Sequence, residues 1–394
     1  MADVLDVLIV GAGPAGSVAA TVLARAGVRV RVIDRGTFPR AKLCGDTLNP
    51  GTLAMLGRLG LVSAVVHRGL PIDGMRLTGE GGVEVLARYP RGLHGLAIPR
   101  TDLDCALLDQ AMQAGASFEP GVGARRAIVS NARDGTRVEG VVVRGVGRES
   151  AMRARVTIAA DGRRSPIAFG LGLARHPPAP RRWAMGAYFE GAAGMSAFGE
   201  MHIRRDCYIG VAPVPGGAAN VCLVTPWVRG ARPGSAADST ALRDSGARIA
   251  QALASDPVLR DRFAAARMIA PPTVLGPLAV DALCRGYDGL LLAGDAAGFI
   301  DPMTGDGMRF AVRGGELAAL AALAALGSGW SGVRERLARQ RAQEFGGKWR
   351  FNRALRTMVA SPLAVAGAAA TARVAPGLVR ALVSRAGDCQ LVGW

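Results

Sequence analysis

The segment spanning residues 4–34 constrains the fold of this chain more than any other. Residues 5–10 form an apolar run of buried-strand length, and residues 17–26 have the composition of a helix. A second apolar run, residues 28–33, ends at Asp34. The turn before the helix consists of Gly11, Ala12, Gly13, Pro14, Ala15 and Gly16. This order predicts a βαβ unit with its glycines in the turn.

Each glycine of this turn has its own physical purpose. Gly11 and Gly13 let the backbone turn sharply and approach a pyrophosphate, and Gly16 lets the helix pack close to the strand. The start of the helix offers unpaired N–H groups and a partial positive charge to the phosphates. Asp34 can accept hydrogen bonds from ribose hydroxyls. An ordinary tight turn is the alternative, but strand, helix and acid in this order indicate a dinucleotide site.

The length and charge of the chain limit its class. With 394 residues, two closely packed domains are expected. We find no run of about eighteen apolar residues, so a membrane-spanning helix is not expected. The formal charge is +17, but Lys42 and Lys348 are the only lysines and the arginines are scattered. Nucleic-acid binding is therefore not expected, whereas attraction of anionic cofactors or lipids is favoured.

The cysteines and histidines carry no metal or disulfide pattern. The six cysteines include no C-x-x-C pair, and the four histidines are dispersed along the chain. This distribution predicts no metal site and no disulfide framework. A reducing cytoplasm is the expected location.

A loop after the second strand carries cations that could neutralise a bound dinucleotide. These are Arg35, Arg40 and Lys42, and a solvated loop is the alternative. Cys44 follows them, and neighbouring cations favour the thiolate that a reactive cysteine requires. A free cysteine is also often a small buried hydrophobe, so both interpretations stay open.

Two further segments place charged groups where a cofactor could bind. A helix is expected after Pro99, with Thr101 as its N-cap and Asp104 in the capping-box position. Arg100 just before it could reach a phosphate, or could form a surface salt bridge. The apolar run 154–159 ends near Asp161 and Gly162, which would lie at the carboxyl edge of a sheet.

The central part of the chain has the pattern of an antiparallel sheet. Short strand candidates at nearly regular spacing occupy residues 183–190, 199–203, 208–213 and 219–225. Residues 70–86 contain two more candidates around a glycine turn. Together they predict a second sheet that belongs to a separate domain.

The chain then returns to a cofactor-like pattern. An apolar strand at 289–293 leads into Gly294 and Asp295, and a helix is expected over residues 309–326. A carboxylate at a strand end can bind a polyol. The small residues of 302–308 let the backbone lie against a flat ring, and the helix start faces negative charge that develops there. This arrangement suits a flavin ring, which becomes negatively charged on reduction.

The remainder, residues 331–394, is predicted to be helical and basic. Its apolar stretch, residues 358–372, is interrupted by Ser361 and Pro362 and flanked by Arg356 and Arg373. A helix pair that covers the core is the ordinary interpretation. A helix that lies on a membrane surface is the alternative and would suit a lipophilic substrate.

The three separated motifs resemble those of the FAD-dependent flavoprotein monooxygenase superfamily, which has the aromatic hydroxylase fold and includes geranylgeranyl reductases and halogenases. The resemblance covers residues 1–330. It implies FAD as the cofactor, with Asp34 on the adenosine ribose, Asp295 on the ribityl chain and Arg100 toward the flavin. Pro302 with residues 305–307 would face the flavin ring.

Within this superfamily the chain looks most like the geranylgeranyl reductase branch. The carrying segments are residues 42–45 and 301–307. The branch pattern Y-x-W-x-F-P is replaced here by residues 208–213 without the internal aromatics, which argues against reduction of an isoprenoid chain. In aromatic hydroxylases, Asp161 and Gly162 are associated with FAD and with the nicotinamide donor, so the resemblance implies NADH or NADPH as electron donor.

The predicted fold class is α/β, with a Rossmann-type FAD-binding domain, an antiparallel-sheet substrate domain and C-terminal helices. The FAD-binding domain would comprise residues 1–69, 96–175 and 276–330, and the substrate domain residues 70–95 and 176–275. Residues 331–394 would form the helical end.

The predicted site residues fall into three groups. Catalytic candidates are Cys44, Pro302 and Gly305. Cofactor-binding candidates are Gly11, Gly13, Pro14, Ala15, Gly16, Asp34, Arg35, Arg40, Cys44, Gly45, Arg100, Asp161, Gly162, Gly294, Asp295, Pro302, Gly305, Asp306, Gly307 and Met308. Substrate-pocket candidates are Trp183, Met185, Tyr188 and Tyr208.

The preferred function is an NAD(P)H-dependent monooxygenase of secondary metabolism that transfers oxygen from a flavin C4a-hydroperoxide to a lipophilic small molecule. O₂ would be its co-substrate. The first alternative is a geranylgeranyl reductase-like enzyme that reduces carbon–carbon double bonds. The second is a flavin electron carrier without catalysis. The expected location is cytoplasmic, with peripheral membrane contact through the C-terminal helices as an open alternative.

Overall fold

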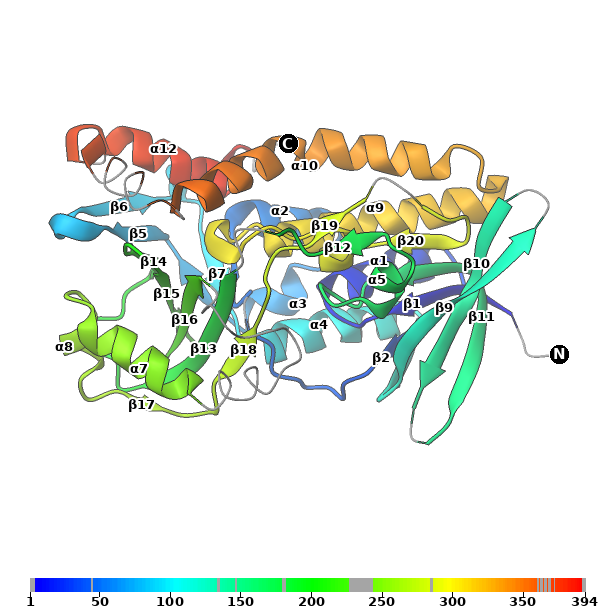
Figure 1. Ribbon diagram of the computed structural model, residues 1–394, viewed down its shortest axis with the longest axis horizontal. Coiled ribbons are helices and arrows are strands. Elements are labelled where there is room, and N and C mark those ends of the chain that lie inside the picture. Colours follow the sequence, from blue (N-terminus) through cyan, green and yellow to red (C-terminus); the bar gives the residue numbers. More distant parts are fainter. Residues whose placement is uncertain are drawn as a thin grey trace.

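Two large β-sheets lie at opposite ends of the molecule in the computed structural model, and helices pack between and over them (Figure 1). The structure describes residues 4–43, 45–132, 135–145, 147–178, 182–226, 244–283, 286–359, 361, 364, 367, 370–371 and 373–391. The predicted α/β class, with a parallel sheet, an antiparallel sheet and C-terminal helices, is confirmed.

The first sheet contains the βαβ unit. Its order is β8 (Ser117–Pro120), β2 (Val30–Asp34), β1 (Leu5–Val10), β11 (Glu149–Ala159), β10 (Gly135–Arg144) and β9 (Gly123–Ala132), with β20 (Leu290–Leu292) also beside β11. The pairing of strand β11 changes along its length. Residues 149–153 pair antiparallel with β10, whereas 154–159 lie parallel between β1 and β20. The parallel strands thereby bring several carboxyl ends to one edge.

Helices cover the parallel part of this sheet. Helix α1 (Pro14–Arg25) packs against α9 (Gly307–Ser328) and α4 (Arg100–Gln113). Helix α4 begins at Arg100 with Pro99 at its N-cap position, so the prediction that Thr101 caps it is wrong by two residues. Pro99 fixes the extended backbone that precedes the helix, and it leaves Thr101 inside the first turn. Among the described helices, α9 is long and apolar enough to cross a membrane, but 61% of its apolar window is buried in the protein.

The second sheet joins segments that are distant in sequence. Its order is β17 (Arg267–Met268), β13 (Arg182–Glu190), β16 (Ala218–Pro226), β15 (Tyr208–Val214), β14 (Phe198–Ile203), β5 (Gly74–Thr78) and β6 (Glu84–Arg88), with β18 (Thr273–Leu275) also beside β13. Strand β5 pairs parallel with β14, which attaches residues 74–88 to the four central strands. Helices α7 (Ser245–Ser255) and α8 (Arg260–Phe263) cover one face through Ile249, Leu253 and Phe263. The opposite face is directed at the interior of the molecule.

Shorter elements connect the two sheets. They are α2 (Pro50–Arg58), α3 (Ser63–Val66), α5 (Pro166–Gly170), β3 (Thr47–Leu48), β4 (Leu70–Ile72), β7 (Gly95–Ala97), β12 (Ala174–Arg175), β19 (Asp281–Ala282) and the short 3₁₀ turns Glu80–Gly82, Pro90–Gly92, Gly294–Ala297 and Pro302–Thr304. Strands β4, β7 and β3 form a small sheet of their own. The predicted division into domains remains a prediction, since no boundary of independent folding is measured.

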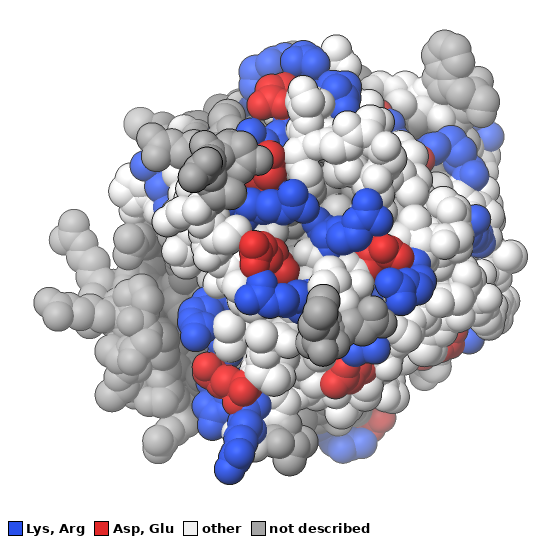
Figure 2. Space-filling view, turned by 90° about the vertical axis from the view of Figure 1, so that its right-hand side faces the viewer, with Lys and Arg blue, Asp and Glu red and all other residues white. Residues whose placement is uncertain are grey.

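The C-terminal part lies along one side of the molecule (Figure 1). It comprises α10 (Val333–Val359), α12 (Pro376–Ala386) and a short 3₁₀ turn (Cys389–Leu391). Helix α10 packs on α9 through Phe310, Phe345 and Trp349, whose ring centroids lie 5.0–6.3 Å apart. Helix α12 lies against β6. A different face, shown in Figure 2, carries arginines and carboxylates side by side.

Candidate functional site

A cavity of about 1160 Å³ begins where the parallel strands end. The residues that follow β1, β2, β11 and β20 at their carboxyl ends all line it: Gly11, Arg35, Asp161 and Gly294. Ligands of open α/β sheets bind at this edge, because loops there leave a crevice between the strand ends and the helices. The cavity continues from this edge to the inner face of the second sheet.

The glycine turn is shaped by close backbone contacts. A Cβ on Gly16 would lie 1.8 Å from the Gly11 carbonyl oxygen, and one on Gly11, at φ +102°, would lie 2.4 Å from the Ala160 carbonyl oxygen. Gly13 differs, because a Cβ there would have the Arg40 guanidinium, at 3.6 Å, as its nearest neighbour. Gly11, Gly13, Pro14 and Ala15 line the cavity, whereas Gly16 is buried between helix and strand. The turn therefore presents open backbone at Gly13 and packed backbone at Gly16.

Asp34 connects the end of β2 to this turn. Its Oδ2 accepts a hydrogen bond from the Ala12 N–H at 2.9 Å, and its Oδ1 accepts one from the Gly36 N–H at 2.8 Å. The carboxylate lines the cavity, and the Arg40 guanidinium lies 3.6 Å away. Because each carboxylate oxygen has two lone pairs, Asp34 can hold the glycine turn and still accept a ribose hydroxyl.

The cations that line the cavity include Arg35, Arg40, Lys42 and Arg100. Arg100 donates two hydrogen bonds of 2.8 Å to Asp104 one turn later on α4, and both side chains are buried. Arg40 Nη2 lies 3.4 Å from the same carboxylate. Burial and, next, the charge of Arg100 lower the pKa of Lys42. The cluster holds more positive than negative charge, so it would accommodate a pyrophosphate.

Asp161 and Gly162 border the same part of the cavity. Neither carboxylate oxygen of Asp161 has a hydrogen-bond partner among the described residues, although both are shielded from solvent. Burial raises the pKa of this carboxyl to about 6. A buried carboxylate without a partner is costly, and a hydroxyl or N–H of a bound ligand would satisfy it.

The segment after β20 supplies another wall. Gly294 and Asp295 line the cavity, followed by Pro302, Gly305, Gly307 and Met308. Gly305 adopts the left-handed conformation at φ +67° and ends the 3₁₀ turn Pro302–Thr304. Helix α9 starts at Gly307, so the positive end of its dipole faces the cavity. Small residues and a helix start together can accept a flat, electron-rich ring.

Asp306 is placed differently from the residues on either side of it. It is not among the described residues that line the cavity. Its carboxylate accepts hydrogen bonds from Lys348 Nζ at 3.0 Å and from Asn352 Nδ2 at 3.2 Å, both on α10. Asp306 therefore attaches the start of α9 to the C-terminal helix. Cys44, predicted as a catalytic or cofactor residue, lies outside the described residues.

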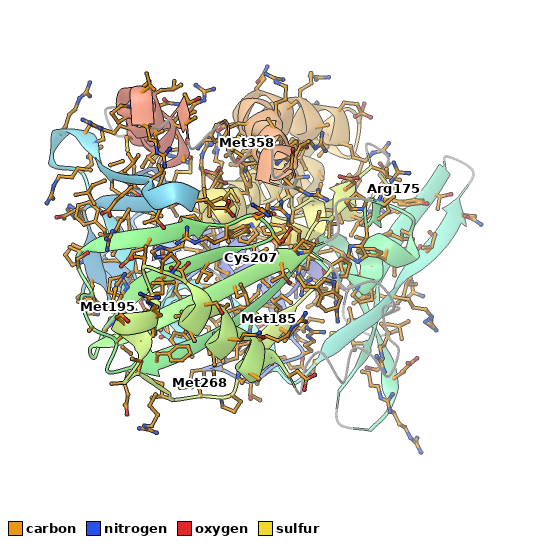
Figure 3. All side chains as sticks on the ribbon, turned by 60° about the vertical axis from the view of Figure 1, so that its left-hand side comes forward. Arg175, Met185, Met195, Cys207, Met268 and Met358 are labelled. Carbon is orange, nitrogen blue, oxygen red and sulfur yellow. The ribbon has the colours of Figure 1, made fainter. Side chains whose placement is uncertain are left out.

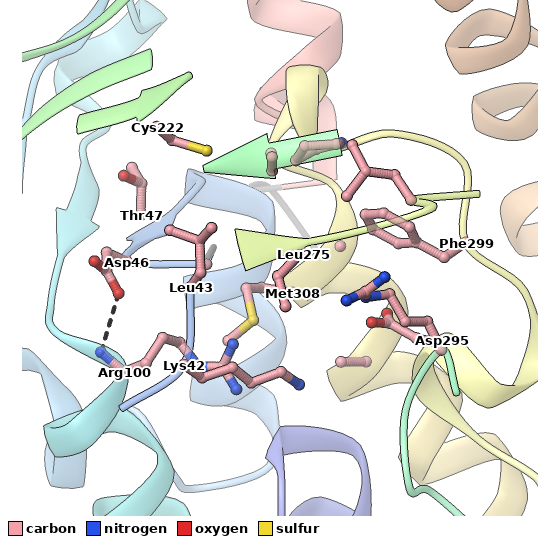
Figure 4. Close-up of a pocket in the computed structure, with 18 of the residues that line it drawn as sticks. Lys42, Leu43, Asp46, Thr47, Arg100, Cys222, Leu275, Asp295, Phe299 and Met308 are labelled. Atoms are coloured by element: carbon pink, nitrogen blue, oxygen red, sulfur yellow. Dashed lines mark hydrogen bonds between the residues drawn. The ribbon is translucent and has the colours of Figure 1, made fainter. Parts of the chain in front are cut away.

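Asp46 is a cavity residue that the sequence patterns did not single out. Its Oδ2 accepts a hydrogen bond of 2.6 Å from the Tyr188 hydroxyl, and its Oδ1 accepts one of 3.1 Å from the Arg100 N–H. Burial raises the pKa of this carboxyl to about 6, against the lowering effect of the Tyr188 hydrogen bond. The only signal in the sequence is its position directly after Gly45. Figure 4 shows Asp46 on the cavity wall, with Leu43 and Met308 nearby.

The four predicted pocket residues separate according to the alternation of the strands. Met185 faces α7 and packs in the same cluster as Ile249 and Leu253, on the outer side of the sheet (Figure 3). Tyr208 lines the cavity, and its hydroxyl donates a 2.5 Å hydrogen bond to Asp301. Tyr188 reaches the site through Asp46. The described lining contains neither Met185 nor Trp183, whose indole covers Gly276.

Beyond the Pro302 segment the cavity becomes apolar. From the second sheet it is lined by Met75, Leu77, Val83, Val85, Met201 and Ile203, and from the C-terminal helices by Phe351, Leu355, Met358, Val379, Leu382 and Val383. We call this part the apolar arm. The C-terminal helices that line the arm belong to the segment that the sequence predicted to be helical and basic, without a binding role. The arm gives the site an apolar wall that could hold a hydrocarbon group.

The described residues fit FAD. The open backbone at Gly13 and the cations suit a pyrophosphate, Asp34 and Asp295 suit the two polyol segments, and the Pro302 segment suits the ring. The carboxylate of Asp161 could accept a hydrogen bond from such a ligand.

Comparison with known proteins gives the family. The profile of the FAD binding domain family matches residues 4–341, so the chain belongs to it. The menaquinone reductase of Mycobacterium tuberculosis is 31% identical over 342 residues, which are 80% of this chain and 76% of that protein. The digeranylgeranylglycerophospholipid reductase 1 of Methanopyrus kandleri is 31% identical over 337 residues, 82% of this chain and 81% of that protein.

A solved structure supports the same fold. The geranylgeranyl bacteriochlorophyll reductase-like protein of Thermoplasma acidophilum matches with a TM-score of 0.77 at 22% identity, covering 92% of this chain and 90% of that chain. The resemblance to the flavoprotein monooxygenase superfamily, with relatives in its geranylgeranyl reductase-like branch, is thus confirmed. The protein is an FAD-dependent oxidoreductase.

Proposed function

We propose that this protein reduces carbon–carbon double bonds in the isoprenoid chain of a prenyl lipid, with NADH or NADPH as electron donor. The observation that carries the proposal is the apolar arm, which continues the cavity beyond the Pro302 segment. Twelve apolar side chains from two distant parts of the molecule line this arm, which suits a hydrocarbon chain better than a single aromatic ring. The names of the menaquinone reductase and of the digeranylgeranylglycerophospholipid reductase support the same substrate class.

In this reaction the bound, reduced flavin would supply the hydride. The residues of the chain have three tasks. Pro302 and Gly305 border the position of the flavin ring. Met75 and Leu77 exclude water from the hydrocarbon chain of the substrate. Asp46, on the cavity wall, holds a proton at its carboxyl group. A raised pKa keeps part of this carboxyl protonated near neutral pH, as a general acid requires.

The test is product analysis with the purified, FAD-loaded protein. We expect anaerobic turnover of a prenyl lipid with NADH or NADPH, and a product that has gained two hydrogen atoms per double bond. A product that has gained one oxygen atom, formed only with O₂, would refute the reductase. Omission of the nicotinamide donor and omission of the lipid are the controls.

Hydroxylation of a lipophilic ring, the function that the sequence patterns favour, is the second candidate. One observation favours it: Asp161 and Gly162, which the resemblance connects with a nicotinamide donor in aromatic hydroxylases, line the cavity. Oxygen uptake stimulated by a phenolic substrate would identify this activity.

A further inference from the structure

Helix α12 presents one face to the cavity and another to solvent. Val379 and Val383 line the apolar arm, and Val379 packs against Val85 of β6 and Val83 just before that strand. On the outer side, Leu378 is 54% exposed and Val374, just before the helix, is 88% exposed. We call Val374, Leu378 and Leu382 the C-terminal apolar surface. Monomeric proteins seldom expose several large apolar side chains together without a use for them.

Leu382 belongs to both faces. It is 38% exposed and also lines the apolar arm. The cavity wall and the C-terminal apolar surface therefore share this side chain. A hydrocarbon chain that enters beside Leu382 would meet Val379 and Val383, which line the arm.

The C-terminal segment that carries this surface is basic, and the carboxylates of Glu80 and Glu84 beside it are paired with Arg205 and Arg76. From residue 345 to residue 394 the chain contains seven Lys or Arg and a single acidic residue, Asp388. Asp388 is 1% exposed and lies 3.1 Å from Lys348 Nζ, so it contributes no negative charge to the surface. Arg373, Arg380 and Arg385 are exposed. Exposed leucines beside arginines are the composition of helices that lie on anionic membranes.

We propose that the C-terminal apolar surface docks on an anionic lipid bilayer and that lipid chains enter the cavity beside α12. Leu378 and Leu382 enter the boundary between headgroups and acyl chains, and Arg385, which follows Leu378 by seven residues on the same side of α12, contacts the phosphates. The docking proposal rests only on the composition of the C-terminal apolar surface and its arginines. The entry of a substrate chain rests on the proposed function.

The experiment is cosedimentation of the FAD-loaded full chain with vesicles of phosphatidylglycerol or phosphatidylcholine. We expect binding to phosphatidylglycerol vesicles that weakens with added salt, and much weaker binding to phosphatidylcholine. The double variant Leu378→Asp, Leu382→Asp should lose about tenfold or more of this affinity. Arg385→Gln, on the same side of α12 as the two leucines, should lose about fivefold on the anionic vesicles only.

A matched control carries the same substitution elsewhere. Ile269 is 44% exposed and follows β17, which lies on the opposite side of the molecule from α12 (Figure 1). Ile269→Asp should bind vesicles as the unmodified protein does. The flavin absorbance spectrum of each variant verifies that the fold and cofactor site are intact.

Three results would overturn the proposal. They are no binding to phosphatidylglycerol, equal binding to both vesicles, and unchanged binding of the double variant. A dimer in solution that the double variant dissociates would identify a second copy as the occupant and would also overturn it. Vesicle binding is measured without turnover, so a failed reductase assay would not contradict the docking proposal.

Discussion

At the residue scale, Asp46 offers the most direct test of the reaction. Its carboxyl has a pKa raised to about 6 by burial, and the proposed role requires the protonated form. The rate of double-bond reduction should therefore fall as the pH rises through about 6. Asp46→Asn should lower this rate by about 10²-fold or more and remove the pH dependence. Reduction of the bound flavin by NAD(P)H, measured by absorbance, should be unchanged.

Tyr188→Phe is the matched control for Asp46. The Tyr188 hydroxyl donates a hydrogen bond that favours the ionised carboxylate, so its removal should raise the pKa of Asp46 further. The falling limb of the pH–rate profile should then move to higher pH. A variant Asp46→Asn that reduces lipid at the original rate would refute the role of Asp46.

Asp161 makes a second prediction, which concerns stability. Its pKa is raised from 3.8 to about 6, so the folded protein holds this proton more tightly than the unfolded chain. Above both values the ionised carboxylate destabilises the FAD-free fold, and below both values the effect vanishes. Asp161→Asn should therefore raise the free energy of unfolding by on the order of 2 kcal/mol well above the higher pKa, without a gain well below 3.8. Denaturant unfolding of the FAD-free protein at two pH values measures this difference.

Sequence patterns identified residues whose position follows from a local rule. Asp34 is the last residue of β2 and Asp161 lies two residues after β11, so their place at the sheet edge could be predicted from the strand pattern alone. Asp46 has no such rule, because its importance comes from Tyr188, which is 142 positions away in sequence. Its burial depends on contacts between the two sheets.

At the scale of elements, the glycine turn separates packing from binding. Gly16→Ala would place a Cβ 1.8 Å from the Gly11 carbonyl oxygen, so it should destabilise the fold by about 3 kcal/mol and abolish FAD binding. Gly13→Ala has room, at φ −75° and with its nearest neighbour at 3.6 Å. It should keep the melting temperature of the FAD-free protein and weaken FAD binding. Thermal unfolding and flavin fluorescence titration measure the two effects, and equal losses in both variants would contradict this separation.

Most strands and helices were predictable because their patterns are local. The run 5–10 and the helix after Pro14 follow from apolar periodicity and the glycine turn. The alternation along β13 was not used in the sequence prediction, so Met185 was assigned to the pocket although it faces α7. Neighbouring residues of a strand lie on opposite faces of the sheet. Helix α7 covers one face of this sheet, so the opposite face meets the cavity.

At the scale of the whole molecule, Lys348 connects three distant segments. Its Nζ lies 3.0 Å from Asp306 at the start of α9, 3.1 Å from Asp388, and 3.0 Å from the Ala386 carbonyl oxygen that it donates to. Lys348→Met should remove the ammonium that neutralises two buried carboxylates, leaving Asp306 with Asn352 and Asp388 with Arg309, and cost about 3 kcal/mol or more. Hydrogen exchange should become faster in α12 and near the Pro302 segment. Protection unchanged in both segments would show that they are not coupled through this lysine.

The contacts of Lys348 with Asp306 and Asp388 could not be predicted from sequence. Lys348 and Asp388 carried no motif, and the basic composition of the C-terminal part suggested only a helical cover. Its contribution to the cavity follows from the packing of α10 on α9 and of α12 on β6, which are long-range contacts.

The scarcity of lysine has a practical consequence for chemical labelling. Both lysine side chains are held inside the protein, Lys42 on the cavity wall and Lys348 in the buried ion cluster. The lowered pKa of Lys42 leaves more of its amine uncharged and reactive, whereas Lys348 is engaged by two carboxylates. An acylating reagent that is small enough to enter should therefore modify Lys42 in the FAD-free protein, and bound FAD should protect it. Acylation of this amine, read by mass spectrometry, would report cofactor occupancy directly.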